Sequence, residues 1–195
     1  MDRELLANFI FEISTLRKTA RSHRQTLLTD DLSDNISSHS NQVTVIGIFL
    51  AEIEGAKIER VVCMCASHDW PETRSGDRNW IHKIYTEIDT ERIIADQFLL
   101  HQSKFMQGII AEYEERKTLE STIAKDADTI AQAVLLKEYA MQGNKEAQAW
   151  LEGKSRKRPY AWADRCKLDS AKELCKAIYD VNPSDWWNNS YANKL

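Results

Sequence analysis

The stretch IERVVCMCASHDWPETRSGD, residues 58–77, decides the fold and carries most of the reactive side chains. Its apolar run VVCMCA is typical of a buried helix. That helix has to end by Pro71, because the residue before a proline is steered out of the α region. The pair His68 and Asp69 is therefore expected at a helix end. Glu72 and Asp77 follow in the next few residues.

Upstream of this stretch the sequence predicts two more helices. Apolar residues recur at spacings of three and four over residues 4 to about 20, which is the pattern of an amphipathic helix. The polar segment 29–37, TDDLSDNIS, predicts a loop that leads into a helix starting near Ser37 or Ser38. The body of that helix, SNQVTVIGIFLAEI (40–53), is apolar on most faces and favours a central position. Its β-branched residues leave a strand as the alternative.

Downstream, three further segments have the helical period. Residues 89–115 predict one long or two shorter helices, residues 120–140 an amphipathic helix, and residues 170–179 a final one. Only 6 Gly and 3 Pro interrupt the chain, which favours long helices over a β-sandwich with its frequent turns. We expect an all-α, compact helical bundle that forms a single domain over residues 1–195.

Composition and charge exclude several classes of protein. Hydrophobic residues make up 43% and charged residues 29%, as in ordinary globular proteins. The net charge of −4 provides no general attraction to a nucleic acid polymer or an anionic membrane, so neither is expected as a partner. No apolar run approaches the length of a membrane span, and the amino terminus is acidic where a signal peptide is basic. We predict a cytoplasmic protein.

Some local features favour structural roles. The basic run at residues 154–158 is interpreted as a solvated loop in preference to a nucleic-acid site, because it is short. Trp186 and Trp187 are expected to anchor the tail by packing. The four cysteines, Cys63 and Cys65 among them, are expected to be reduced structural thiols, because C-x-C is not a zinc-site spacing.

Four segments together indicate a metal site. They are NISSHS with His39, the run with His68 and Asp69, AKDADTIAQA with Asp126 and Asp128, and the basic segment LRKTARSHR near the amino terminus. Two imidazoles and two carboxylates suit one Mn, Fe, Co, Ni or Zn ion per chain better than Ca or Mg. Such an ion acidifies a bound water and polarises a phosphoryl oxygen, so hydrolysis of a phosphoester is the expected reaction.

Two acidic residues are candidates for proton transfer. Glu72 lies four residues after His68 and three after Asp69, a spacing that brings it to the same side of a helical turn. From there it can accept a proton from a metal-bound water as general base. Asp77 follows Gly76, which permits an unusual backbone angle, so its carboxyl group can turn back and assist the leaving oxygen as an acid.

These strings resemble the HD superfamily of metal-dependent phosphohydrolases, and its 5′-deoxynucleotidase-like branch in particular. The resemblance runs from FIFEISTLRKTARS through NISSHS, HDWPETRSGD and KDAD to DWW, and thus spans most of the chain. It implies the HD-domain helical bundle and a homodimer, which the apolar helical surface with Trp150 and Trp162 also favours. It implies that Asp128 completes the ligand set of His39, His68 and Asp69, while Asp126 supports the site or caps a helix.

The resemblance also implies substrate contacts. It makes Glu72 and Asp77 the catalytic carboxylates and Arg21 a phosphate-binding residue. The chain departs from the branch at Asp34, where Glu is common, and at residues 22–24, Ser-His-Arg, where an aromatic residue often lies against the base. No role is assigned to His23, His82 and His101.

Three functions remain open on these residues. The first is removal of phosphate from (deoxy)nucleoside 5′-monophosphates, whose two negative charges one ion and Arg21 can match. The second is hydrolysis of a longer phosphate chain, by a deoxynucleoside triphosphate triphosphohydrolase or a guanosine tetraphosphate hydrolase. It needs more cations, of which Lys83 and residues 154–158 are the only obvious ones. The third is a non-catalytic, metal-binding regulatory protein. The first is preferred.

Overall fold

The computed structural model describes residues 2–101, 103–155 and 159–188, and this part of the chain is all-α, as predicted. The described residues form no strand, and Ala20 and Asn35 are joined by an isolated β-bridge. The helices are α1 (Arg3–Ser14), α2 (His23–Leu27), α3 (Ile36–Glu54), α4 (Ile58–Ser67), α5 (Glu72–Ser75), α6 (His82–Tyr85), α7 (Thr90–His101), α8 (Lys104–Glu115), α9 (Leu119–Met141), α10 (Lys145–Leu151), α11 (Asp169–Asp180) and α12 (Asp185–Asn188), with 3-10 turns η1 (Thr15–Lys18) and η2 (Trp162–Arg165).

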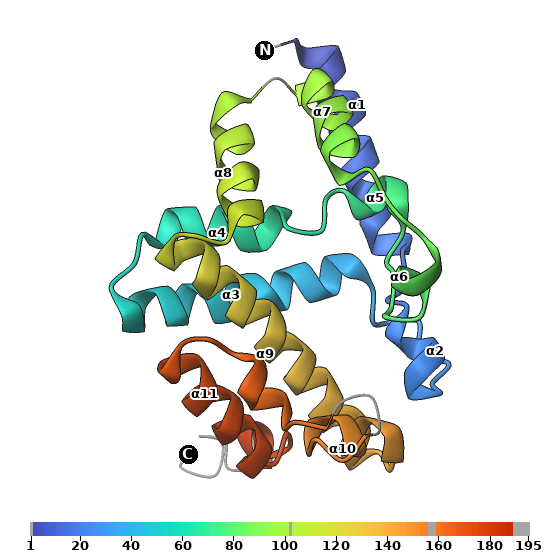
Figure 1. Ribbon diagram of the computed structural model, residues 1–195, viewed down its shortest axis with the longest axis vertical. Coiled ribbons are helices and arrows are strands. Elements are labelled where there is room, and N and C mark those ends of the chain that lie inside the picture. Colours follow the sequence, from blue (N-terminus) through green and yellow to red (C-terminus); the bar gives the residue numbers. More distant parts are fainter. Residues whose placement is uncertain (1, 102, 156–158, 189–195) are drawn as a thin grey trace.

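Helices α3, α4 and α9 pack against one another and form the centre of the molecule (Figure 1). Their facing residues, such as Val43, Val61 and Ile130, are fully buried. Gly47 lies where α3 packs closely against α4, since a Cβ atom built there would stand 2.6 Å from Sγ of Cys65. The missing side chain lets the two helices that carry the predicted histidines approach each other.

The start of α3 lies within two residues of the start predicted from the sequence. The helix begins at Ile36, and the side chain of Asn35 accepts a hydrogen bond from the backbone N–H of Ser38. The strand alternative is wrong, because the segment is helical throughout. The buried apolar residues of this segment lie on one side of a helix, and they do not alternate with polar residues as those of a strand would.

The first predicted helix is shorter than expected. Helix α1 ends at Ser14, and the chain tightens into η1 before it extends at Ala20. The hydroxyl of Thr15 bonds to the carbonyl of Glu12, a local contact that competes with continued helix. The extended segment pairs with the entry to α3, where the N–H of Arg21 donates to the carbonyl of Asp34 at 2.9 Å. The early end therefore carries Arg21 toward the centre of the molecule.

The long helices of the later part of the chain were predicted, and the two-helix alternative for residues 89–115 is confirmed. Residues 89–115 form two helices, and the side chain of Ser103 caps the second by accepting from the N–H of Met106. Helix α10 was not predicted, because it is short and begins in a polar segment; Asn144 caps it. None of the described helices is long and apolar enough to cross a membrane.

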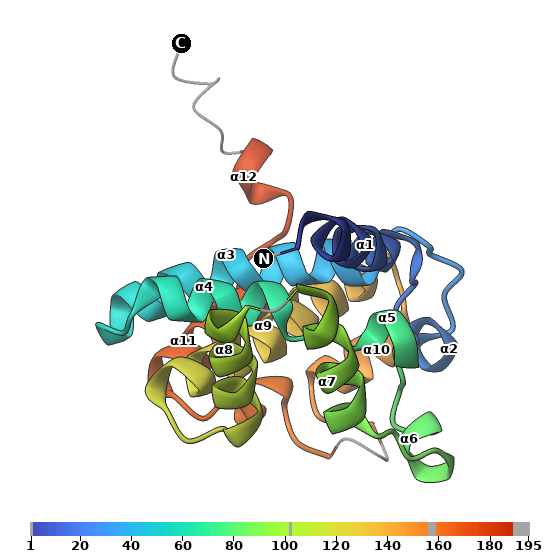
Figure 2. The ribbon, with the colours of Figure 1, turned by 90° about the horizontal axis from the view of Figure 1, so that it is seen from above.

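The positions of several tryptophans differ from those predicted from the sequence. Trp150 and Trp162 are buried and stack in parallel with ring centroids 6.2 Å apart, so they are core residues and add nothing to an exposed apolar surface. Trp186 is 77% exposed on α12, which stands away from the body in Figure 2, although it also lines an apolar groove. In the basic run, Lys154 pairs with Glu152, and residues 156–158 lie outside the described residues.

The cysteines are free thiols, as predicted, and all except Cys63 are buried.

Candidate metal centre

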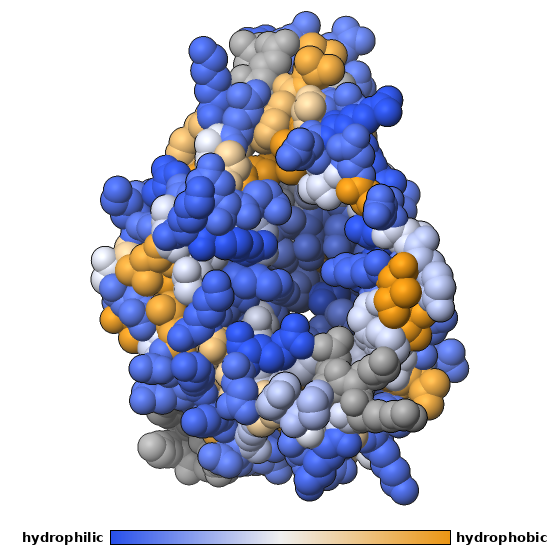
Figure 3. Space-filling model, viewed as in Figure 1, coloured by the Kyte–Doolittle hydropathy of each residue, from blue (hydrophilic) through white to orange (hydrophobic). Residues whose placement is uncertain are grey.

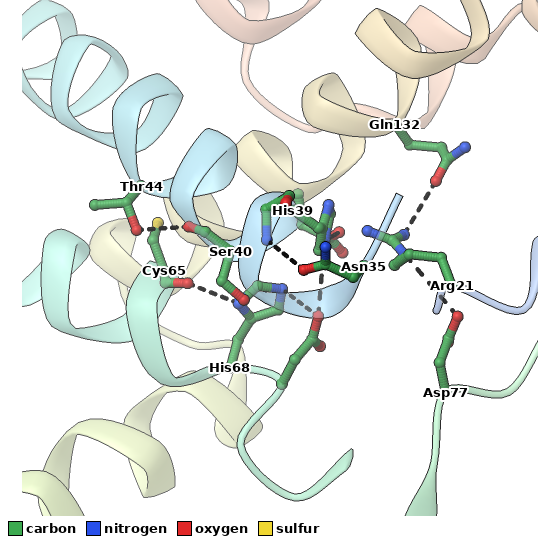
Figure 4. A network of polar contacts seen from close by, with 12 residues as sticks. Arg21, Asn35, His39, Ser40, Thr44, Cys65, His68, Asp77 and Gln132 are labelled. Carbon is green, nitrogen blue, oxygen red and sulfur yellow. Dashed lines mark hydrogen bonds and ion pairs between the residues drawn. The ribbon is translucent and has the colours of Figure 1, made fainter. Parts of the chain in front are cut away.

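The three central helices deliver the predicted ligands to one place. His39 lies on the inner face of α3, one turn before Val43, and is 5% exposed. His68 and Asp69 follow directly after α4, and Asp128 comes from the middle of α9. Figure 4 shows the side chains of His39 and His68 pointing toward the same space from two helices. Residues that are remote in sequence therefore meet because the core packs these helices together.

His39, His68 and Asp69 form the group that is best suited to a metal ion. Each offers one ligand atom, and these atoms all lie within 4.8 Å of one another. The two imidazole rings stand 5.4 Å apart between centroids, at 61° to each other. Two nitrogen donors and one oxygen donor in a buried pocket are the ligands that divalent transition ions prefer.

A test of the metal assignment comes from the hydrogen bonding of His68. Its Nδ1 lies 2.8 Å from the carbonyl oxygen of Cys65, which can only accept, so Nδ1 carries the proton. The other nitrogen, Nε2, is buried, makes no hydrogen bond and lies 3.1 Å from Oδ2 of Asp69. A nitrogen lone pair and a carboxylate oxygen repel at this distance unless a cation or a proton lies beside them. The donor set therefore fits a bound cation.

Asp128 lies beside this group but is not part of it. Its Oδ1 is 3.0 Å from Nε2 of His39, while its Oδ2 is 2.6 Å from Nζ of Lys125. One oxygen thus faces the imidazole and the other is held by a cation on the preceding helical turn. The structure brings the fourth predicted ligand to the site, with an ammonium group that the sequence reasoning did not include.

The electrostatics of the site favour the ligand forms of His39 and Asp128, whereas the pKa of His68, although burial opposes its protonation, is raised by the neighbouring carboxylate of Asp69. Burial, together with Arg21, lowers the pKa of His39 despite the attraction of Asp128, so this imidazole is neutral. Burial opposes ionisation of Asp128, but Lys125 and His39 lower its pKa well below the usual range. A neutral imidazole and an ionised carboxylate are the forms that bind metal.

Asp126 has the capping role that was one of its two expected roles. It is 1% exposed, and its carboxylate accepts hydrogen bonds from the backbone N–H groups of Lys167 and Leu168 at 2.8 to 3.0 Å. These are the residues just before α11, so the carboxylate stabilises the start of that helix. Asp126 and Asp128 therefore face different partners on α9.

Glu72 lies in the same cavity as the candidate ligands. Its Oε2 is buried and has no hydrogen-bond partner. Burial, followed by the charges of Asp69 and Asp77, raises the pKa of Glu72 to about 9. In this environment the carboxyl group holds a proton at neutral pH, and it is one of the groups whose charge a nearby cation would change.

Asp77 is turned back into the pocket, as predicted from Gly76, whose φ is +68°. Its Oδ2 accepts hydrogen bonds from the backbone N–H and the hydroxyl of Ser22, at 2.5 and 3.0 Å. Nε of Arg21 lies 3.9 Å from the same oxygen. The carboxylate thus anchors the segment that carries Arg21.

Arg21 is buried and held from several sides. Its Nη2 lies 2.6 Å from Nε2 of His23 and 3.1 Å from Oε1 of Gln132, and Figure 4 shows it between Gln132 and Asp77. His23, to which no role was assigned, is thus a partner of Arg21. Burial and the charge of Arg21 lower the pKa of His23 to about 3, so its ring is a neutral acceptor. Gln132 gave no signal in the sequence.

These side chains line a cavity of about 420 Å³. Figure 3 shows it as a central hollow with hydrophilic walls. Basic residues of the wall come from five separate segments and are more numerous than the sequence indicated: Arg21, Arg78, Lys83, Arg116, Lys125 and Arg165. They are scattered through the sequence, so no local pattern could have identified them as neighbours.

Known proteins share this architecture. A structure from Magnetospirillum magnetotacticum, described as a predicted metal-dependent phosphohydrolase, is 27% identical over 91% of this chain and 90% of its own, with a TM-score of 0.63. Two archaeal structures share the fold alone. A conserved hypothetical protein from Pyrococcus furiosus is 19% identical, with a TM-score of 0.68 over 90% of this chain and 99% of its own. A predicted coding region of Archaeoglobus fulgidus is 20% identical, with a TM-score of 0.58 over 94% and 99%.

Among curated proteins none matches the sequence significantly. The family model described as the HD domain matches residues 13–167, which take in every candidate ligand, both candidate catalytic carboxylates and Arg21. The match covers well over half of the sequence, and the chain therefore belongs to the HD-domain family.

Proposed function

We propose that this chain is a metal-dependent phosphohydrolase that removes phosphate from (deoxy)nucleoside 5′-monophosphates. The observation that carries the proposal is the close approach of His68 Nε2 and Asp69 Oδ2, 3.1 Å apart without a hydrogen bond, in a cavity that also holds Glu72. The fold-level likeness to a protein described as a predicted metal-dependent phosphohydrolase supports it. His39, His68, Asp69 and Asp128 would hold about one Mn, Fe, Co, Ni or Zn ion.

A bound ion would polarise the phosphoryl group and acidify water, and the surrounding side chains supply the rest. Glu72 is the candidate general base. Its raised pKa results from burial and from the carboxylates of Asp69 and Asp77. When Asp69 shares its charge with a cation, one of these causes is removed, and Glu72 can then give up its proton and accept one from water.

Asp77 and Arg21 line the same cavity as Glu72. The hydrogen bonds that Asp77 accepts from Ser22 support a role in positioning Arg21 better than the proton-donor role expected from the sequence. Arg21 supplies a buried positive charge for the phosphate. Gln132 and His23 fix the direction of its guanidinium group, which reduces the entropy lost when an anion binds.

Phosphate release from nucleotides tests the proposal. Phosphate, pyrophosphate and triphosphate release would be compared for one deoxynucleoside series with Mn and Co. We expect phosphate release from the 5′-monophosphate to be fastest, because one ion and Arg21 match its charge. Predominant triphosphate release would overturn the preference in favour of the longer-chain alternative. A protein that binds metal but turns over no phosphomonoester would instead support the regulatory alternative.

We also propose that the protein is a homodimer. Trp150 and Trp162 are buried and cannot contribute to a dimer interface. The proposal is supported instead by a stripe of exposed apolar residues on the outer side of α3. Val45, Phe49 and Ile53 are 48%, 57% and 64% exposed there and recur at a spacing of four. An exposed apolar stripe of this kind is typical of a helix that packs against a partner. Light scattering should give about twice the chain mass of 22.5 kDa, and a monomer mass would count against it.

A further inference from the structure

Two arginines on the cavity wall, Arg116 and Arg165, have guanidinium groups that stack on aromatic rings. The guanidinium carbon of Arg116 lies 3.4 Å from the ring centroid of Tyr113, and that of Arg165 lies 4.5 Å from the ring centroid of Trp162. All four residues line the same cavity. Stacking on an aromatic face fixes the plane of a guanidinium group while leaving its N–H donors free at the edge.

Three of the other basic residues of the wall, in contrast, have polar side-chain or backbone partners. Arg21 bonds to His23 and Gln132, Lys125 pairs with Asp128 at 2.6 Å, and Arg78 donates to Thr86. Within the described parts of the chain, no carboxylate lies within 4.0 Å of the guanidinium nitrogens of Arg116 or Arg165.

Arg116 also shows backbone and burial features that point to a ligand. It ends α8 in the left-handed conformation, with φ of +56°, where glycine is favoured and a larger residue is strained. Its Nη1 is buried and has no hydrogen-bond partner among the described residues. A buried N–H group without an acceptor costs free energy, which an anionic oxygen in the cavity would recover.

Arg116 lies close to the candidate metal centre. Tyr113, the ring under its guanidinium group, packs edge-on against His68 with centroids 5.8 Å apart. A single aromatic ring thus separates Arg116 from a candidate metal ligand. In the proposed function the candidate metal ligands and Arg21 would hold the phosphate that is hydrolysed, which leaves Arg116 and Arg165 available for a different anionic group of the same substrate.

We infer that Arg116 and Arg165 bind a second phosphate group of the substrate, which rests on the proposed phosphohydrolase function. The substrate class is a nucleotide that carries one phosphate for hydrolysis and another that is recognised and retained. Two guanidinium groups suit a phosphate because each can donate two parallel hydrogen bonds to its oxygens. The inference refines the monophosphatase proposal, since the reaction remains the removal of one phosphoryl group.

The test compares a nucleoside 3′,5′-bisphosphate with the corresponding 5′-monophosphate in the metal-loaded protein. Arg116→Gly removes the side chain and suits the positive φ, and Arg165→Gln removes the second charge. We expect wild type to prefer the bisphosphate in kcat/KM, and the double variant to lower the ratio of the two kcat/KM values about tenfold or more. Arg116→Lys should restore only part of the ratio, because an ammonium group lacks the planar fork. Lys117→Ala removes the adjacent charge and should leave the ratio unchanged.

Equal losses for both substrates, or an unchanged ratio, would overturn the inference. Failure of the proposed function gives a different result, namely no phosphate release from either substrate by wild type. In that case calorimetric titration with inorganic pyrophosphate decides the inference separately. Tighter binding to wild type than to the double variant would support the anion site, and equal binding would reject it.

Discussion

The protonation of Glu72 depends on its burial and on the charges of its neighbours. Its pKa of about 9 arises from burial and from the carboxylates of Asp69 and Asp77, and its Oε2 has no hydrogen-bond partner. If it accepts a proton from water in the metal-loaded protein, Glu72→Gln should keep the metal and lose about 10²- to 10⁴-fold in kcat. Metal content and phosphate release would be measured together, with Glu91→Gln on the exposed start of α7 as control. Parallel loss of metal and rate would make Glu72 a ligand.

Asp126 and Asp128 form a matched pair for a second prediction. Asp128→Ala should empty or weaken the metal site, because its Oδ1 lies 3.0 Å from His39. Asp126→Ala should keep the metal but lower the free energy of unfolding by about 1–3 kcal/mol, because the N–H groups of Lys167 and Leu168 lose their acceptor. Metal analysis and thermal unfolding separate the two effects. The idea would fail if both variants lost metal equally.

Gln132, which the sequence did not indicate, has its partner far along the chain. Arg21 and Gln132 are separated by 111 positions, and their contact depends on how α9 crosses the entry to α3. His23 acquired significance only through its bond to Arg21. The candidate ligands were easier to find, because metal-binding residue types stand beside one another in short, distinctive strings.

At the scale of helices, the site depends on how closely α3 approaches α4. A Cβ atom on residue 47 would lie 2.6 Å from Sγ of Cys65 and 3.1 Å from a methyl group of Val61. Gly47→Ala should therefore destabilise the protein by about 1–3 kcal/mol, despite the better helix propensity of alanine. It should also weaken metal binding, since His39 and His68 come from these two helices.

Gly108→Ala on α8 is the control for this prediction. Nothing lies within 4 Å of a Cβ atom built there, so the change should stabilise the protein by up to about 1 kcal/mol. Chemical denaturation of the two variants would compare the effects. Equal stabilisation by both would show that the approach of α3 and α4 is looser than described.

Helical periodicity identified most of the long helices, because each buries one face against the core. It could not locate the end of α1, where a threonine hydroxyl competes for a carbonyl group, or the short α10, which is defined mainly by its cap. These boundaries depend on single hydrogen bonds. A periodic pattern averages over such contacts and does not resolve them.

At the scale of the whole molecule, Glu12 joins three helices at one end of the bundle. Its carboxylate on α1 accepts hydrogen bonds from Arg74 and Thr73 of α5 and from Gln97 of α7, each at 2.8 Å. Hydrogen bonds from Arg74, opposed by burial and aided by Gln97 and Thr73, lower its pKa to about 2. Ionised Glu12 thus holds together elements that are distant in the sequence.

Because the pKa of Glu12 is lower in the folded protein than its ordinary value of 4.5, the ionised carboxylate stabilises the fold at pH values above about 4.5. This stabilisation is lost as the pH falls toward 2. Glu12→Gln should therefore reduce the free energy of unfolding by about 1–2 kcal/mol at pH 7, allowing for solvent screening. The difference from wild type should shrink between pH 4.5 and 2. Glu4→Gln, on the exposed first turn of α1, is the control. A difference that does not depend on pH would contradict the ionic role of Glu12.

The most direct test of the account is a metal titration of the stripped protein while phosphate release from a deoxynucleoside 5′-monophosphate is recorded. Mn or Co would be added to wild type and to His68→Ala, and the bound ion measured in the same samples. The account predicts that wild-type activity rises from near zero to a plateau at about one bound ion per chain, and that His68→Ala neither fills the site nor releases phosphate. Phosphate release by the metal-free protein, or equal metal binding and activity in His68→Ala, would contradict it.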